Sequence, residues 1–251
     1  MRALHTVATG VLVTTSRQMA TTSTVLTSGR DALLIDPAWM PDELDALAAS
    51  LSQRDLRVVG GFATHAHHDH LLWHPAFGDA PRWASRRTAE LARSERAALV
   101  EYLGPHFPSA LKNLMGQVDG VEVIPENPTS ATFAPELIVH DGHAPGHTAL
   151  WLAEQRVLIA GDMLSDVELP LPFYPDDLPA YLEALDVLAS YAQHAEVVIP
   201  GHGSPSYYPL ERVDADRRFL EAVIRGSKPN DRRLEYPGMQ EALEHLREMV
   251  V

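Results

Sequence analysis

The segment ATHAHHDHLLW, residues 63–73, places four histidines and an aspartate within six positions, directly after the apolar run LRVVGGF. An apolar run of this length is typical of a buried strand, so the polar cluster lies where that strand ends. On extended backbone, side chains two residues apart point to the same side, so His65 and His67 can bind one ion together. Asp69 and His70 follow where the chain must turn, and they can face a second position. Imidazole and carboxylate both suit Zn²⁺, and the pattern therefore predicts a metal site.

Three further residues of metal-ligand type stand where apolar runs give way to loops. His147 follows a Pro-Gly turn in HAPGHTAL, Asp162 ends the run VLIAGD, and His202 lies between two glycines in VVIPGHG. Such junctions are where an α/β architecture assembles its site. His143 is predicted to support a ligand from behind, with an ordinary loop histidine as the alternative. Asp36, in LLIDP, either supports the site from outside or forms the turn before the proline.

Composition narrows the classes of function. The chain has no cysteine, which excludes disulfides, thiolate metal sites and thiol nucleophiles. Its formal net charge of -14 disfavours nucleic acid and anionic membranes as partners. The threonine-rich start indicates strands rather than a signal peptide, and no run is long enough to span a membrane. We therefore expect a cytoplasmic protein with a small-molecule substrate, and we leave a homodimer open.

The hydrophobic pattern predicts sheets with helices outside them. Thr- and Val-rich runs before Gly29 and the run DALLIDP after it predict a hairpin, and residues 41–54 predict a helix that begins at Pro41. Residues 85–103 have helical periodicity, and runs such as TFAPELIVHDG and RVLIAGD predict strands. Residues 104–120 form either a lid or a surface connection. We expect one domain over residues 1–251, with residues of about 211–251 as closing helices.

The ordered motifs HAHHDH, PGH, GD and PGHG resemble those of the metallo-β-lactamase superfamily of hydrolases. The resemblance runs in motif order from the N-terminal strands to about residue 205, and it implies an α+β fold, the four-layer αββα sandwich. It also implies a dinuclear site carried over position by position. Its first metal would be held by His65, His67 and His147, its second by Asp69, His70 and His202, and Asp162 and a hydroxide would bridge the two.

The resemblance further implies a hydrolase in which the bridging hydroxide attacks a small carbonyl substrate, such as a lactone, ester or thioester. Asp69 would orient that hydroxide. Because the chain has Asp162 and no cysteine, it is more similar to the hydroxyacylglutathione hydrolase and lactonase branch than to the lactamases. Two alternatives stay open: a phosphodiesterase or nuclease of the same superfamily, and a mononuclear iron sulfur dioxygenase. Two Zn²⁺ ions are expected, although Mn²⁺ or Fe²⁺ fit the same residues.

Overall fold

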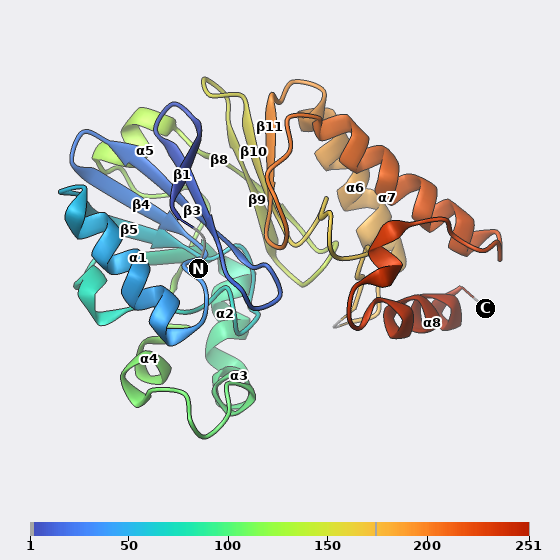
Figure 1. Ribbon diagram of the computed structural model, residues 1–251, viewed down its shortest axis with the longest axis horizontal. Coiled ribbons are helices and arrows are strands. Elements are labelled where there is room, and N and C mark those ends of the chain that lie inside the picture. The colour runs from blue at the N-terminus through green and yellow to red at the C-terminus, as the bar shows by residue number, and fades with distance from the viewer. Residues whose placement is uncertain (1–2, 174, 251) are drawn as a thin grey trace.

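Two β-sheets face each other in the computed structural model, which describes residues 3–173 and 175–250 (Figure 1). The first sheet has seven strands in chain order: β1 (His5–Ala8), β2 (Val11–Thr15), β3 (Thr22–Ser28), β4 (Asp31–Ile35), β5 (Arg57–Phe62), β6 (Arg82–Ser85) and β7 (Asp119–Val121). The second has four, in the spatial order β11 (Val197–Pro200), β10 (Val157–Gly161), β9 (His147–Leu152) and β8 (Glu136–His140).

Helices cover the outer faces of both sheets. The first sheet carries α1 (Pro41–Gln53), α2 (Arg86–Ser94), α3 (Arg96–Tyr102) and α4 (Ser109–Leu114). The second carries α6 (Leu178–Ala192), α7 (Pro209–Ile224) and α8 (Met239–Met249). The short helix α5 (Pro128–Phe133) lies against β3 and β4. Two 3₁₀ turns, η1 (Pro75–Phe77) and η2 (Arg232–Glu235), complete the elements.

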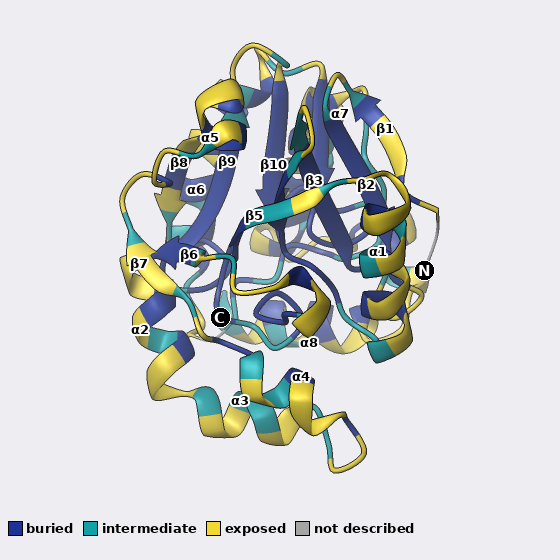
Figure 2. Ribbon diagram, turned by 90° about the vertical axis from the view of Figure 1, so that its left-hand side faces the viewer, coloured by how far each residue is buried: buried dark blue, intermediate teal, exposed yellow. Residues whose placement is uncertain are grey.

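The buried apolar side chains form three clusters, one for each interface between layers. One joins the two sheets, one joins the first sheet to α1, α2 and α4, and one joins the second sheet to α6, α7 and α8. Buried strands therefore form the centre of the molecule, and the exposed residues lie on the outer helices, the loops and the edge strands β1, β7 and β8 (Figure 2). This confirms the α+β class and the four-layer αββα arrangement.

Most of the predicted elements are confirmed. The chain turns between β3 and β4 at Gly29, whose φ of 59° favours glycine. α1 begins at Pro41, with acidic residues in its first turn. The helices α7 and α8 lie where closing helices were predicted. Among the described residues no helix has the length and apolar character needed to cross a membrane.

The helical character predicted for residues 85–103 is confirmed, although the chain forms two helices there, because Glu95 ends α2 with φ −100° and ψ 3°. One local prediction was wrong in part. The run TFAPELIVHDG begins as the end of α5, and only its later part is strand. Asn127 explains this difference, because its side chain accepts hydrogen bonds from the backbone amides of Thr129 and Ser130 and so starts a helix there.

Candidate metal centre

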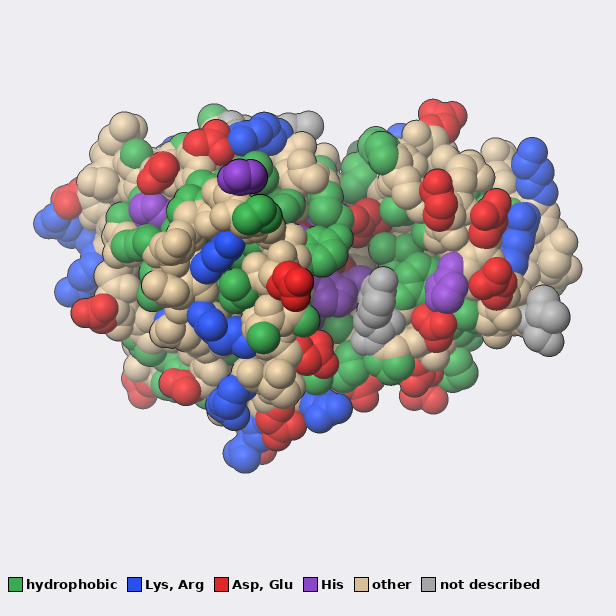
Figure 3. Space-filling model, turned by 90° about the horizontal axis from the view of Figure 1, so that it is seen from below, with side chains coloured by type: hydrophobic (Ala, Val, Ile, Leu, Met, Phe, Trp, Pro, Cys, Tyr) green, Lys and Arg blue, Asp and Glu red, His purple; other side chains and the backbone are tan. Residues whose placement is uncertain are grey.

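The candidate site lies at one edge of both sheets. β4, β5 and β6 run parallel to one another, as do β10 and β11. Asp36 follows β4, the histidine segment follows β5, Asp162 follows β10 and His202 follows β11. The carboxyl ends of parallel strands share an edge, which brings these side chains together. In Figure 3, histidine side chains are visible at the bottom of a hollow between the two halves of the molecule.

A first cluster joins three histidines to Asp162. His65 Nε2 lies 3.0 Å from His67 Nδ1, and His143 Nε2 lies 3.2 Å from the same nitrogen. Asp162 Oδ2 lies 3.3 Å from His65 Nε2 and 3.4 Å from His143 Nε2. These four side chains could hold one metal ion, since each directs a ligand atom to a common point.

His147 does not join this cluster, contrary to the sequence-based expectation. Its Nε2 accepts a hydrogen bond from the backbone amide of Asp162 at 3.0 Å, and its Nδ1 lies 3.2 Å from His140 Nε2. Both ring nitrogens are therefore engaged away from the cluster. Gly161 permits this contact, because a Cβ atom there would overlap His147 Nε2. The place expected for His147 is taken by His143, which had been predicted only to support a ligand.

A second cluster contains the three residues predicted for it. Asp69 Oδ2 lies 3.5 Å from His70 Nε2 and 3.4 Å from His202 Nε2, and the two histidine nitrogens are 3.4 Å apart. Asp162 faces this cluster too, with Oδ1 at 3.2 Å from His70 Nε2 and Oδ2 at 3.2 Å from His202 Nε2. One carboxylate thus lies between the two groups of histidines, as the predicted bridging role requires.

Asp36 fixes two of the histidine rings from behind. Its Oδ2 lies 2.9 Å from His70 Nδ1 and accepts a hydrogen bond from Thr64 Oγ1 at 2.7 Å. The donating Thr64 hydroxyl can then accept from His65 Nδ1, which lies 3.0 Å away. Each ring places its proton on Nδ1 in this arrangement, so Nε2 presents a lone pair to the cluster. Of the two roles left open for Asp36, the structure supports the one behind the site.

Backbone carbonyls do the same for two further rings. His143 Nδ1 lies 3.0 Å from the carbonyl oxygen of Leu171, and His202 Nδ1 lies 2.9 Å from that of Met19. A carbonyl only accepts, so Nδ1 must donate and Nε2 is left for the site. This is the arrangement by which proteins orient metal-binding histidines.

Burial and the nearby carboxylates shift the pKa values of the histidines in opposite directions. Burial lowers the pKa of His143 to about 3 and holds the pKa of His67 well below its usual value. Burial also lowers the pKa of His202, but the Asp162, Glu168 and Asp69 carboxylates outweigh it and raise the pKa to about 10. Without a cation, the His67 and His143 rings are therefore neutral, whereas His202 is protonated and offsets part of the carboxylate charge. A bound cation would take over that charge.

The donor set fits a divalent metal. Asp162 Oδ1 is buried and forms no hydrogen bond, which is costly unless a cation lies beside it. Gly201 leaves room for this carboxylate, because a Cβ atom there would overlap Asp162 Oδ1. Imidazole nitrogens and carboxylate oxygens are ligands for Zn²⁺, Mn²⁺ or Fe²⁺, and the geometry does not choose among these ions.

Glu168 is a site residue that sequence reasoning missed. It contributes to a third group of ligand atoms with Asp162 and His202, and its Oε1 lies 3.7 Å from His202 Nδ1. Burial raises the pKa of Glu168 to about 7, although His202 opposes that shift. The residue comes from a loop with no metal-ligand spacing, so no pattern marked it.

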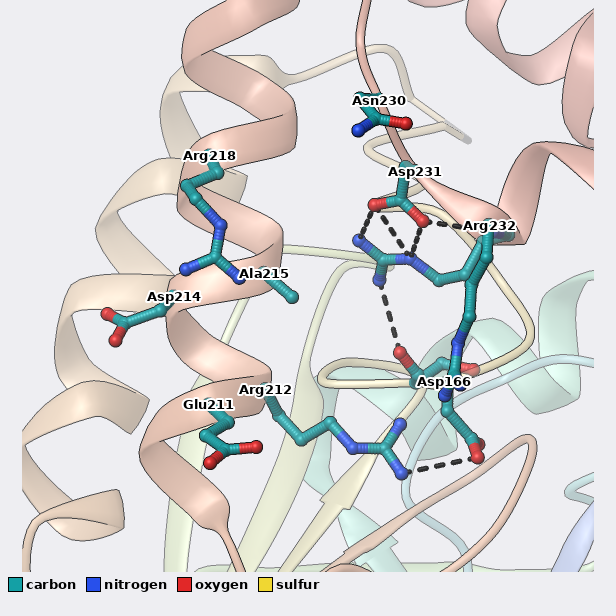
Figure 4. A pocket seen from close by; sticks show the side chains of 11 residues that line it. Asp166, Glu211, Arg212, Asp214, Ala215, Arg218, Asn230, Asp231 and Arg232 are labelled. Carbon is teal, nitrogen blue, oxygen red and sulfur yellow. Dashed lines mark hydrogen bonds and ion pairs between the residues drawn. The ribbon is translucent and has the colours of Figure 1, made fainter.

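Arginines hold the loop that carries Asp162 and Glu168. Arg212 reaches from α7 to Asp166, with 3.2 Å between Nη2 and Oδ2 (Figure 4). Arg233, at the start of η2, donates to the backbone carbonyls of Ser165 and Glu168 at 3.1 Å each. The position of the bridging carboxylate thus depends on α7 and on the segment before α8.

A cavity of about 750 Å³ opens onto the two clusters. Its described lining includes residues of α2 and α3 together with Leu171, Phe173 and Pro175. No described lining residue comes from 104–120, the segment left open as a lid. That segment instead supports α3, since Arg96 donates to the carbonyls of Lys112 and Met115 at 2.8 and 3.1 Å.

Comparison with known proteins gives consistent matches. The model of the metallo-beta-lactamase superfamily matches residues 17–202. The chain is 28% identical over 207 residues to the probable metallo-hydrolase YflN of Bacillus subtilis (strain 168), covering 69% of this chain and 75% of that protein. The solved structure of a metallo-beta-lactamase family protein from Thermus thermophilus, TTHA1429, is similar, with a TM-score of 0.63, 21% identity and coverage of 97% and 95% of the two chains.

A second curated relative is the atrochrysone carboxyl ACP thioesterase of Aspergillus chevalieri. The two are 24% identical over 222 residues, which cover 85% of this chain. The match spans only 64% of the length of that relative.

Proposed function

Because the chain belongs to the metallo-β-lactamase superfamily and is a metal-dependent hydrolase, we propose that it cleaves small carbonyl substrates. The proposed substrates are thioesters or lactones, and the proposed metal is a pair of Zn²⁺ ions. The observation that carries the proposal is the position of the buried Asp162 carboxylate between two groups of histidines. Four of those rings are held with Nε2 facing the site. A cytoplasmic location and a small-molecule partner belong to the same proposal.

The residues of the site suit attack by water on a carbonyl group. Divalent ions bound there would acidify a water molecule and polarise the substrate. Asp69 lies in the pocket wall, and Thr21 Oγ1 donates to its Oδ2 at 3.1 Å, which fixes the carboxylate. We assign to Asp69 the orientation of the attacking water. The sequence has no cysteine, so water is the nucleophile consistent with its composition.

Support for the substrate class comes from one relative and from the composition of the pocket. The Aspergillus relative is named as a thioesterase, which is an acyl-transfer activity to water. Apolar residues line much of the cavity, whereas a phosphodiester substrate would favour a basic groove. Hydrolysis of a thioester or lactone is therefore the activity to test first, with a bis-aryl phosphate as the competing class.

The experiment combines metal content with a substrate panel. We expect about two Zn²⁺ or Mn²⁺ per chain and cleavage of a thioester or lactone. Asp162→Ala should lose at least one metal and most activity, whereas Asp214→Ala, at an exposed position on α7, should change neither. One iron per chain would contradict the dinuclear proposal and favour the dioxygenase alternative. Cleavage of the phosphodiester alone would overturn the substrate class.

A further inference from the structure

We propose, on the basis of the proposed function, that the face of α3 toward the cavity binds an apolar acyl group and so selects thioesters or lactones with long hydrocarbon chains. The residues concerned are Ala98, Leu99 and Tyr102, which line the cavity beside the metal clusters.

The lining of the cavity combines the metal clusters with apolar side chains. His67, His143 and the aspartates lie where the reacting carbonyl would bind. The apolar lining comes from Leu91 and the face of α3 in the first half of the chain and from Leu171, Phe173 and Pro175 in the second half. A substrate whose carbonyl group is held at the clusters would place its substituent against these apolar residues. The cavity volume of about 750 Å³ is within the range of sites that enclose drug-sized ligands.

The fold covers the apolar residues of α3 only in part. None of the residues of this helix is buried, and Tyr102 is 75% exposed although its ring contacts that of His68. A contiguous exposed apolar surface beside a reaction centre usually has a binding role. The helix is nevertheless fixed in place, because the Arg96 side chain donates to carbonyl oxygens of the α4 segment. This face of α3 is therefore preformed and available to a ligand.

Away from the metal clusters, the charged residues of the cavity do not favour a strongly anionic substituent on the substrate. Arg87 is the one Arg or Lys among the described lining residues, and it pairs with Glu90 at 3.4 Å. Glu95 adds negative charge to the same lining. Glutathione carries two carboxylates, so this lining offers it little charge compensation. A neutral acyl chain meets no such cost, and burying each of its methylene groups is favourable.

Two adjacent alanines on α3 provide a matched test. Ala98 lines the cavity and Ala97 does not, although both are exposed. Hydrolysis of N-acetylcysteamine thioesters with acetyl, hexanoyl and decanoyl groups would be measured for the metal-loaded wild type, Ala98→Asp and Ala97→Asp. Binding of 2-decanone, which is neutral and not hydrolysed, would be measured by calorimetry. This second readout does not depend on turnover.

We expect kcat/KM of the wild type to be at least about tenfold higher for decanoyl than for acetyl thioester. Ala98→Asp should reduce this ratio about tenfold and weaken 2-decanone binding similarly, with metal content unchanged. Ala97→Asp should match the wild type. Equal rates for all chain lengths, or equal effects of the two variants, would overturn the acyl-binding role of α3 while leaving the hydrolase intact. If no thioester is cleaved but 2-decanone binds at Ala98, the reaction class fails and the apolar site stands.

Discussion

At the scale of single residues, the two histidines of the GHAPGH segment should differ in their effects. His143→Ala removes a ring that faces His67 and Asp162, so we expect loss of metal at the first cluster with little change in the stability of the metal-free protein. His147→Ala leaves the buried Asp162 amide without its acceptor, which should lower the free energy of unfolding by about 1–3 kcal/mol. Metal content by mass spectrometry and urea unfolding of the metal-free protein measure the two effects.

His147→Gln serves as the control for this pair, since a glutamine oxygen can accept the Asp162 amide without an imidazole. It should recover part of the lost stability and keep full metal content at saturating metal. If His147→Ala empties the first cluster while His143→Ala keeps it filled, the assignment expected from the sequence would be correct after all.

The sequence identified most of the residues that converge. His65, His67, Asp69 and His70 follow one strand, and their spacing alone places them together. The error at His147 has a physical cause, because Gly-His occurs twice within six residues. Only the turn after β8 decides which ring faces the site, and His147 is already paired with His140 across β8 and β9. Backbone carbonyls such as that of Leu171 also orient the rings. Every residue has a backbone carbonyl, so the sequence does not reveal which ones accept these hydrogen bonds.

At the scale of elements, Arg233 connects the segment before α8 to α7 and to the loop that carries Glu168. It is buried, its Nη1 lies 2.5 Å from Asp216 Oδ1 on α7, and its Nη2 lies 2.8 Å from Asp231 Oδ2. Arg233→Met would leave Asp216 buried without its partner, so we expect a loss of about 3–5 kcal/mol in the free energy of unfolding. Urea unfolding of the metal-free protein measures this loss without the contribution of metal binding.

The neighbouring exposed Arg232 gives the matched control, and Arg232→Met should change the unfolding free energy by less than about 0.5 kcal/mol. The double variant Arg233→Met, Asp216→Leu removes both buried charges and should recover much of the loss. An unfolding free energy for Arg233→Met that equals that of Arg232→Met would show that the buried pair contributes nothing.

The sequence predicts elements well where the hydrophobic pattern extends over many residues. It predicts them less well where a single polar residue determines the boundary of a helix. α1 and the β3–β4 hairpin follow directly from their apolar patterns and from Pro41 and Gly29. The division into α2 and α3 depends on the backbone at Glu95, and Arg96 holds α3 against the α4 segment instead of along the axis of α2. The sequence period continues through the break, so periodicity alone could not locate it.

At the scale of the whole molecule, the candidate metal centre connects the two halves of the sandwich. The first sheet supplies His65, His67 and the residues after them, and the second sheet supplies His143, Asp162 and His202. Between the sheets lies a shared apolar core, but at this edge the two halves meet through polar, buried side chains. Metal binding should therefore stabilise the packing of the whole domain, because ligands from both sheets must stay in place together.

Removal of metal should lower the melting temperature, because a metal that binds only the folded protein stabilises it. A ligand at a thousandfold excess over its Kd stabilises the folded state by about 4 kcal/mol. For a chain of this size, that free energy corresponds to a rise in melting temperature of roughly 8–16 °C. Circular dichroism melts of the chelated protein, with and without restored Zn²⁺ or Mn²⁺, measure the shift. Asp162→Ala should show a much smaller shift, since it weakens both clusters at once, whereas Asp214→Ala should retain the full one. A wild-type melting temperature that does not change with metal, in protein shown to hold two ions per chain, would contradict a centre that joins the two sheets.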